Sequence, residues 1–112
     1  MMELKIDPTN KNQSIITTIT VDNEARRVRF DIVYKEYVDK WYVSLYDVLK
    51  EEFLCTNIPL ISSYELINDL FKPYHYKHIG MLICFPAVDE PETEDPSEDN
   101  LDEFHVCWGE RI

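Results

Sequence analysis

Apolar and polar residues alternate with a period of two along much of this chain, and this pattern constrains its fold more than any other feature. Every second residue from Val28 to Tyr34 is apolar or aromatic, and the segment 41–48 alternates in the same way. The segment 13–21 is rich in β-branched residues, which suit a pleated surface. Successive side chains of a strand point to opposite faces, so these segments are predicted to be strands with one face toward a core.

The short connections at 22–24 and 35–40 predict that these three strands follow one another as an antiparallel meander. A further strand is predicted at 53–61, where Pro59 marks a sheet edge or a strand end because proline cannot donate to a ladder. The segment 79–85 is apolar throughout and is predicted to be a strand buried on both faces. A last strand is expected at 101–108.

One short helix is predicted between the fourth and fifth of these strands. Ser63 is a suitable N-cap, apolar residues follow at helical spacing up to Phe71, and Lys72-Pro73 is expected to end the helix. The chain has 112 residues, the usual size of a single core. We therefore predict one all-β domain over residues 1–112, a small antiparallel β-sandwich or barrel with one short helix. The alternative is an α+β domain in which that helix is longer.

Acidic residues are concentrated in one segment. The formal net charge is -11, and residues 89–103 hold nine acids and no base. Without them the remaining charge is -11 + 9 = -2. Such a run, broken by Pro91 and Pro96, repels itself and has little apolar surface, so we expect a solvated acidic loop at about 87–100 between two strands. The overall charge argues against binding nucleic acid through its phosphates and against an anionic membrane surface.

The cysteines and the N-terminus bear on the cellular compartment. Cys55, Cys84 and Cys107 each lie in an apolar run, and three buried, unpaired thiols fit a reducing cytosol better than a disulfide framework. The N-terminal residues lack the pattern of a signal peptide, and no apolar stretch approaches the ~20 residues of a membrane helix. We expect synthesis in a cytoplasm.

The residues that could carry chemistry do not form a recognised site. The sequence has only two glycines, Gly80 and Gly109, which is too few for a glycine-rich phosphate loop. His75 and His78 form an H-x-x-H, but zinc needs about four convergent ligands and the sequence has no C-x-x-C pair. The acidic segment has no glycine and so lacks the EF-hand pattern. We expect no catalytic residue, no metal and no cofactor, and therefore not an enzyme.

Exposed aromatic and basic residues are the remaining functional signal. Tyr42 and Tyr46 are predicted on the face opposite Trp41, where they either meet a protein partner or are covered by loops. Arg27 and Arg29 share a strand face, which is either solvated or an ion-pairing patch for an acidic partner, such as the acidic loop of a neighbouring copy. With two aromatic residues of the 74–78 connector, the candidate interface residues are Tyr42, Tyr46, Arg27, Arg29, Tyr74 and Tyr76.

An ordered set of short motifs runs through nearly the whole chain. In order, it consists of Trp41-x-x-Ser44-Leu45-Tyr46-Asp47, Ile58-Pro59-Leu60, Asp69-Leu70-Phe71-x-Pro73-Tyr74, Ile79-Gly80-Met81-Leu82-Ile83 and the segment 98–106, EDNLDEFHV. This order resembles the small plug domain of contractile-tailed phage baseplates. The sequence departs from that family in its longer acidic loop, in Asp102 at a position where the family tends to have glycine, and in lacking a glycine-bearing turn after Asp47.

The resemblance implies a β-sandwich-like structural protein of the virion, without catalysis, that assembles with other baseplate, hub or tail-tube proteins. It implies a place near the end of the tail tube, in copies that form a homo-oligomeric ring around the tail axis. Acidic residues facing the lumen would repel DNA phosphates and prevent sticking. Two other functions stay open at this point: an acidic inhibitor or nucleic-acid mimic that occupies a basic cleft, and, with least support, a small enzyme.

Overall fold

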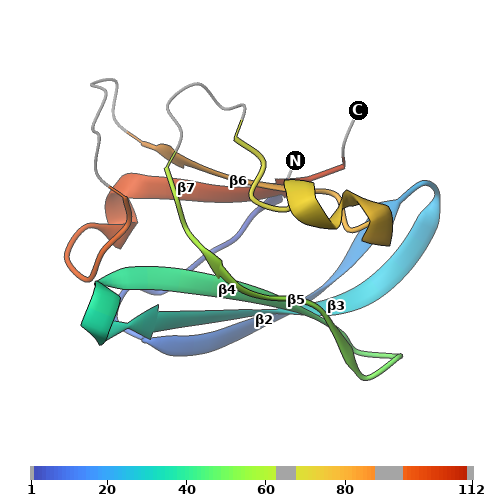
Figure 1. Ribbon diagram of the computed structural model, residues 1–112, viewed down its shortest axis with the longest axis horizontal. Helices are drawn as coiled ribbons and strands as arrows, with labels where there is room; N and C mark the ends of the chain where they lie inside the picture. The colour runs from blue at the N-terminus through green and yellow to red at the C-terminus, as the bar shows by residue number, and fades with distance from the viewer. Residues whose placement is uncertain (1, 63–67, 88–94, 111–112) are drawn as a thin grey trace.

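The computed structural model describes residues 2–62, 68–87 and 95–110, and in this part of the chain two antiparallel sheets pack face to face (Figure 1). The larger sheet has the order β2-β3-β4-β5 and is formed by β2 (Asn12–Val21), β3 (Glu24–Lys35), β4 (Lys40–Asp47) and β5 (Glu52–Pro59). The smaller sheet has the order β1-β7-β6 and is formed by β1 (Met2–Glu3), β6 (Met81–Pro86) and β7 (Phe104–Gly109). The predicted all-β sandwich is confirmed, and the α+β alternative is wrong.

The predicted three-strand meander is formed by β2, β3 and β4, whose connections are short, and β5 extends it to a fourth strand. Asp22 and Asn23 form a two-residue turn between Val21 and Glu24, and both have a left-handed backbone, with φ of 53° and 65°. Two consecutive positive φ angles are those of a type I′ turn, and Asp and Asn tolerate them without glycine. Pro59 is the last residue of β5, which is an edge strand, as its lack of a donor predicts.

The helical segment differs from the prediction. Residues 63–67, where the helix was expected to begin, lie outside the described residues. The described part contains a short 3-10 helix, η2 (Lys72–Lys77), which begins where the sequence was expected to stop it. Proline has no N–H to lose in the first turn of a helix, so Pro73 starts this element instead of ending one. Two more 3-10 turns, η1 (Glu36–Val38) and η3 (Leu101–Glu103), adjoin β4 and β7.

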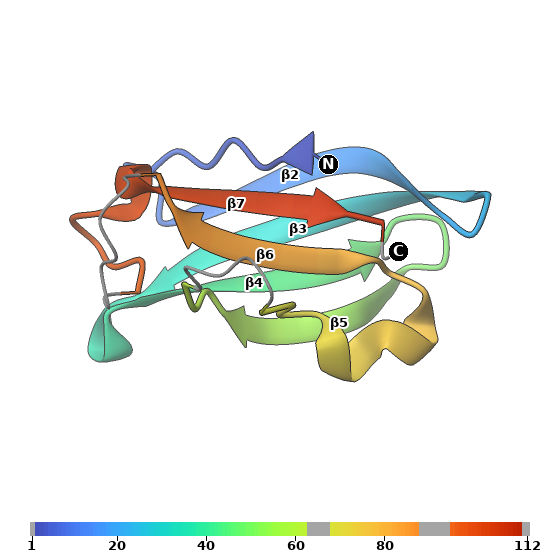
Figure 2. The same cartoon turned by 90° about the horizontal axis from the view of Figure 1, so that it is seen from above.

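The core lies between the sheets and is made by the inward face of each strand. Its largest fully buried side chains include Trp41 and Phe30 from the larger sheet, Leu82 from the smaller one, and Leu60 and Phe71 from the segments between β5 and β6. Figure 2, a view from above, shows β6 and β7 lying across the larger sheet and covering its upper face. The opposite face of the larger sheet, below in Figure 1, is covered by no other element drawn there. That uncovered face is the outer face.

Candidate assembly surface

The outer face brings together four of the six predicted interface residues. The strand register sets Arg29 of β3 beside Tyr46 of β4, and Tyr46 is set beside Phe53 of β5. The Arg29 guanidinium carbon lies 4.3 Å from the centroid of the Tyr46 ring, and the Tyr46 and Phe53 ring centroids are 5.0 Å apart. Arg29 also donates to both carboxylate oxygens of Asp31, at 2.7 Å and 2.9 Å. These residues therefore form an ordered row across three strands.

The other residues of the outer face extend this row along the sheet. The Lys35 ammonium lies 4.3 Å from the Tyr42 ring centroid and donates to the Asn57 side chain at 3.0 Å. Arg27 is exposed and sits opposite Thr18 of β2. Tyr42 and Tyr46 are half-buried, and each contacts its basic neighbour.

Sequence reasoning missed two apolar residues of this surface. Ile16 of β2 is 53% exposed and Phe53 of β5 is 49% exposed. Ile16 lies in a strand whose two faces both carry β-branched residues. The alternation of residue types therefore does not show which face of the sheet Ile16 is on. Only the pairing of Ile16 with Arg29, which the strand register supplies, places it on the outer face.

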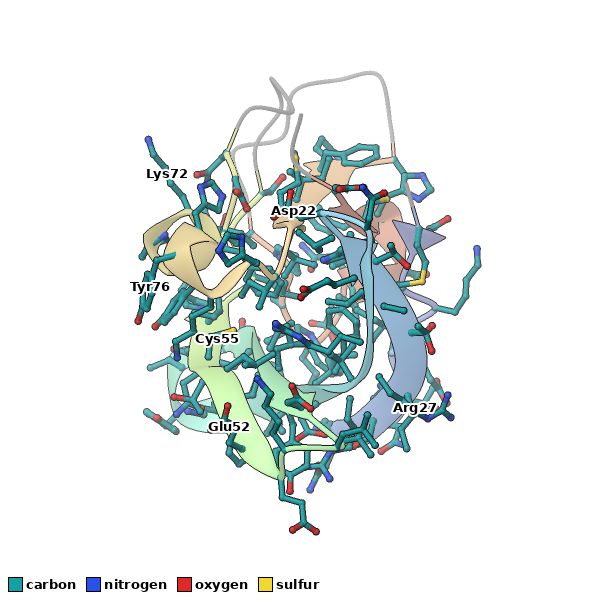
Figure 3. All side chains as sticks on the ribbon, turned by 90° about the vertical axis from the view of Figure 1, so that its right-hand side faces the viewer. Asp22, Arg27, Glu52, Cys55, Lys72 and Tyr76 are labelled. Carbon is teal, nitrogen blue, oxygen red and sulfur yellow. The ribbon has the colours of Figure 1, made fainter. Side chains whose placement is uncertain are left out.

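Tyr74 and Tyr76 lie elsewhere, on η2 at the β5 side of the sandwich. Figure 3 shows Tyr76 and Arg27 on different sides of the molecule. Tyr76 projects into solvent, whereas Tyr74 packs against the core and lines an open groove of about 400 Å³ with Ile58, Pro59 and Ile61. The predicted set is thus two separate groups and not one patch.

The acidic segment is attached to the body along its described part. Asp95 accepts the Ser62 N–H at 3.0 Å and pairs with Lys40 at 3.1 Å, and Glu98 pairs with Lys11 at 2.9 Å. The Trp41 indole N–H donates to the carbonyl of Ser97 at 2.8 Å. Residues 95–100 lie between β6 and β7 and are tethered by these contacts, while Glu98 and Asp99 stay exposed. Residues 88–94 lie outside the described part.

The three cysteines have the character of core residues. All three are free and buried, as predicted. Burial raises the pKa of the Cys55 thiol to about 11 and the pKa of the Cys84 thiol to about 12. Burial likewise raises the pKa of the Cys107 thiol. A thiol with a raised pKa carries little thiolate at neutral pH, so none of these cysteines is an activated nucleophile.

The histidines are paired with separate carboxylates. His75 pairs with Asp69, His78 with Asp22 at 2.9 Å, and His105 with Glu3 at 2.7 Å. In residues 2–62, 68–87 and 95–110, no group of three or more His, Cys, Asp or Glu side chains could hold a metal ion. Nor does any helix of this part have the length and apolar character needed to cross a membrane.

The most buried acidic residue of the described part is Asp47, at the end of β4, and its contacts stabilise a turn. One oxygen of its carboxylate accepts the backbone N–H groups of Leu49 and Lys50, at 3.1 Å and 3.0 Å. The other oxygen lies 3.7 Å from Nε of Arg26. Asp47 therefore holds the β4–β5 turn, where Glu51 takes the left-handed backbone (φ 54°) for which glycine would be usual.

Asp69 and Gly80 fix the segment that leads into β6. One oxygen of the Asp69 carboxylate accepts the N–H groups of Phe71 and Leu82, at 2.8 Å and 3.0 Å, and the other contacts His75. Gly80 has φ of +77°, and a Cβ on it would lie 2.6 Å from the Trp108 ring. This position therefore requires glycine.

A comparison with protein-family models matches residues 1–111 to the family described as "Cyanophage baseplate Pam3 plug gp18". The chain belongs to this baseplate plug family. No curated protein matches it. The match agrees with the resemblance read from the motifs, and the structure explains what those motifs do in this plug protein. Trp41 and Leu45 are buried in the core, and Asp47, Asp69 and Gly80 build turns.

Proposed function

We propose that this plug protein is a non-catalytic structural component at the end of the phage tail tube, and that it acts by contacts with other baseplate, hub or tail-tube proteins. The observation that carries the proposal is the family match over residues 1–111. The buried motif residues, such as Trp41, Leu45 and Asp47, serve the core and its turns, so contacts with partners fall to the outward-facing side chains.

We place the main contact on the outer face. Tyr, Phe and Arg are enriched at protein interfaces because they offer large contact areas together with polar groups. In the row Arg29–Tyr46–Phe53, the arginine is already held by Asp31 and stacked on Tyr46. Side chains that are ordered before binding lose less conformational entropy when a partner arrives.

The test replaces the plug gene in the phage and counts complete baseplates by electron microscopy. A double variant, Tyr46→Ser with Phe53→Ser, should fold yet assemble few complete baseplates. Tyr37→Ser is the matched control, because Tyr37 is 81% exposed on η1 and off the outer face. Normal assembly of the double variant would remove the outer face from the proposal. Normal tails in the absence of the plug gene would overturn the function itself.

We further propose a ring of copies around the tail axis, with the acidic segment toward the lumen. The described part of that segment lies at one end of the sandwich, beside η1 (Figure 1). A ring with these ends inward would line its opening with carboxylates and repel DNA phosphates. A map of the assembled baseplate in which this end points outward would contradict the arrangement.

The alternative of an acidic inhibitor or nucleic-acid mimic has less support. A mimic needs free carboxylates on an ordered surface, but in residues 95–100 Asp95 and Glu98 are paired with lysines of the same chain. No observation on the described residues favours an enzyme.

A further inference from the structure

The strand β2 forms an open edge of the larger sheet. Within the described residues it lies at the end of the order β2-β3-β4-β5 and pairs only with β3. In an antiparallel ladder, residues alternate between hydrogen-bonding to the neighbour and pointing their backbone groups away from it. Lys11 bonds to Tyr34 of β3 through its carbonyl, at 2.9 Å. Counting along the register from that bond, the backbone groups of the even-numbered residues 12–20 point outward, away from β3.

These outward-pointing residues are accessible. All five of them are exposed: Asn12, Ser14, Ile16, Thr18 and Thr20. The N–H of Asn12 is occupied by the Asn10 side chain at 3.2 Å. Among the backbone hydrogen bonds of the described residues, none involves the outward groups of Ser14, Ile16, Thr18 or Thr20.

β2 also lacks the features that usually protect an edge. Natural edge strands are blunted by charged side chains, proline or bulges. Residues 12–21, NQSIITTITV, contain no charged residue and no proline, and their pairing with β3 runs without a register shift. An unprotected edge of this length is a template for another strand.

We propose that β2 pairs antiparallel with the β2 strand of a second copy of this chain, across a two-fold axis at Ile16. In this register Ile16 faces its own equivalent, Ser14 faces Thr18 of the second copy, and Asn12 faces Thr20. Among these outer-face side chains, isoleucine thus meets isoleucine and uncharged polar residues meet uncharged polar residues, so no charge is placed opposite another. The outward backbone groups of the two strands also fall opposite one another, so the ladder continues through the contact.

Charge and edge geometry favour this occupant over others. The chain carries a net charge of -11, and β2 is a surface where two copies can meet without placing charges opposite each other. The other edge of the sheet, β5, has register shifts in its pairing, a left-handed Asn57 and the terminal Pro59. These features spoil a ladder between β2 of one copy and β5 of the next.

The contact would join two larger sheets into one continuous sheet with a common outer face. It is isologous, so it differs from the head-to-tail contacts that close a ring. It goes beyond the proposed function, because it concerns the association of free copies and does not depend on a baseplate partner.

Sedimentation equilibrium of the full chain over a range of concentrations tests the proposal. We expect the mass to rise from the monomer value of 13.4 kDa toward twice that value. Ile16→Lys should remain monomeric throughout, because two like charges would face each other at the axis. Leu49→Lys is the matched control: Leu49 is 80% exposed, lies in the β4–β5 turn, and should leave the dimer intact. A monomeric wild type, or a dimer that Ile16→Lys does not weaken, would overturn the proposal.

Disulfide trapping tests the register independently of affinity. Directly opposed residues in a bonded antiparallel pair have Cα atoms about 5.5 Å apart, within the disulfide range of about 4.4–6.8 Å. Ile16→Cys should therefore cross-link two copies under mild oxidation. Thr20→Cys should not, because the two introduced thiols would be eight residues apart along the ladder, about 27 Å. The native cysteines are buried and stay silent. Equal cross-linking of the two variants would refute the two-fold axis at Ile16.

Discussion

Asp47 offers the sharpest test of how the sequence motif holds this fold. Its side chain is 2% exposed and bonds two backbone N–H groups and Arg26. Removing one partner of a buried ion pair costs about 3–5 kcal/mol when the other is left unpaired. The Arg26 side chain keeps some solvent contact and the turn residues Leu49 and Lys50 are exposed, so water recovers part of this loss. We expect Asp47→Ala to lower the free energy of unfolding by about 2–4 kcal/mol.

Equilibrium unfolding in urea measures the effect, with the slope of the transition checked against wild type. Asp47→Asn keeps an oxygen for the turn N–H groups but turns an amide toward Arg26, so its loss should be smaller, about 1–2 kcal/mol. Glu52→Ala is the control, because Glu52 is the exposed strand partner of Asp47 and should change stability by less than about 0.5 kcal/mol. If Asp47→Ala were no more destabilising than Glu52→Ala, the carboxylate would not hold the turn.

Three further predictions concern the core and the acidic end. Gly80→Ala should destabilise the protein by about 2–4 kcal/mol in thermal unfolding, because it combines positive-φ strain with a clash against Trp108. The Tyr34 hydroxyl donates to the Asp39 carboxylate at 2.5 Å and lowers the pKa of Asp39. The ionised carboxylate therefore stabilises the fold fully above the ordinary pKa of an aspartate. This stabilisation is lost as the pH falls through the lowered pKa of Asp39. Asp39→Asn should therefore flatten the loss of unfolding free energy between about pH 5 and about pH 2. Cys84, buried with a raised pKa, should resist thiol reagents at pH 8 until urea unfolds the chain.

The architecture was predictable because strands of the larger sheet alternate apolar and polar residues and are joined by short turns. Every second residue from Val28 to Tyr34 faces the core as the spacing requires, and the turn at Asp22-Asn23 forms without glycine. The prediction of the helix boundary was wrong for a physical reason. Lys72-Pro73 fits both the end of one helix and the first turn of another, and local sequence does not distinguish the two.

The surface was less predictable because it depends on register. Tyr42 and Tyr46 could be placed on an outer face, but nothing in the chain order shows that Arg29 stacks on Tyr46 or that Ile16 joins them across β2. Tyr74 and Tyr76 could not be separated from that set without the position of η2. The anchoring of residues 95–100 likewise depends on Lys40 and Lys11, which are distant in sequence.

The motifs that identify the family report its architecture and not its partners. The carboxylates of Asp47 and Asp69 accept hydrogen bonds from backbone N–H groups. Position 80 requires glycine because of its φ angle and the nearby Trp108 ring. A side chain whose polar atoms are already bonded within the fold has little to offer another protein. Recognition therefore falls to side chains that point outward, among them Tyr46, whose place in the Trp41–Asp47 motif points its ring outward while Leu45 and Asp47 point inward. Substitutions at inward motif positions should act through stability, whereas those at Tyr46 and Phe53 should reduce assembly by more than their loss of stability explains.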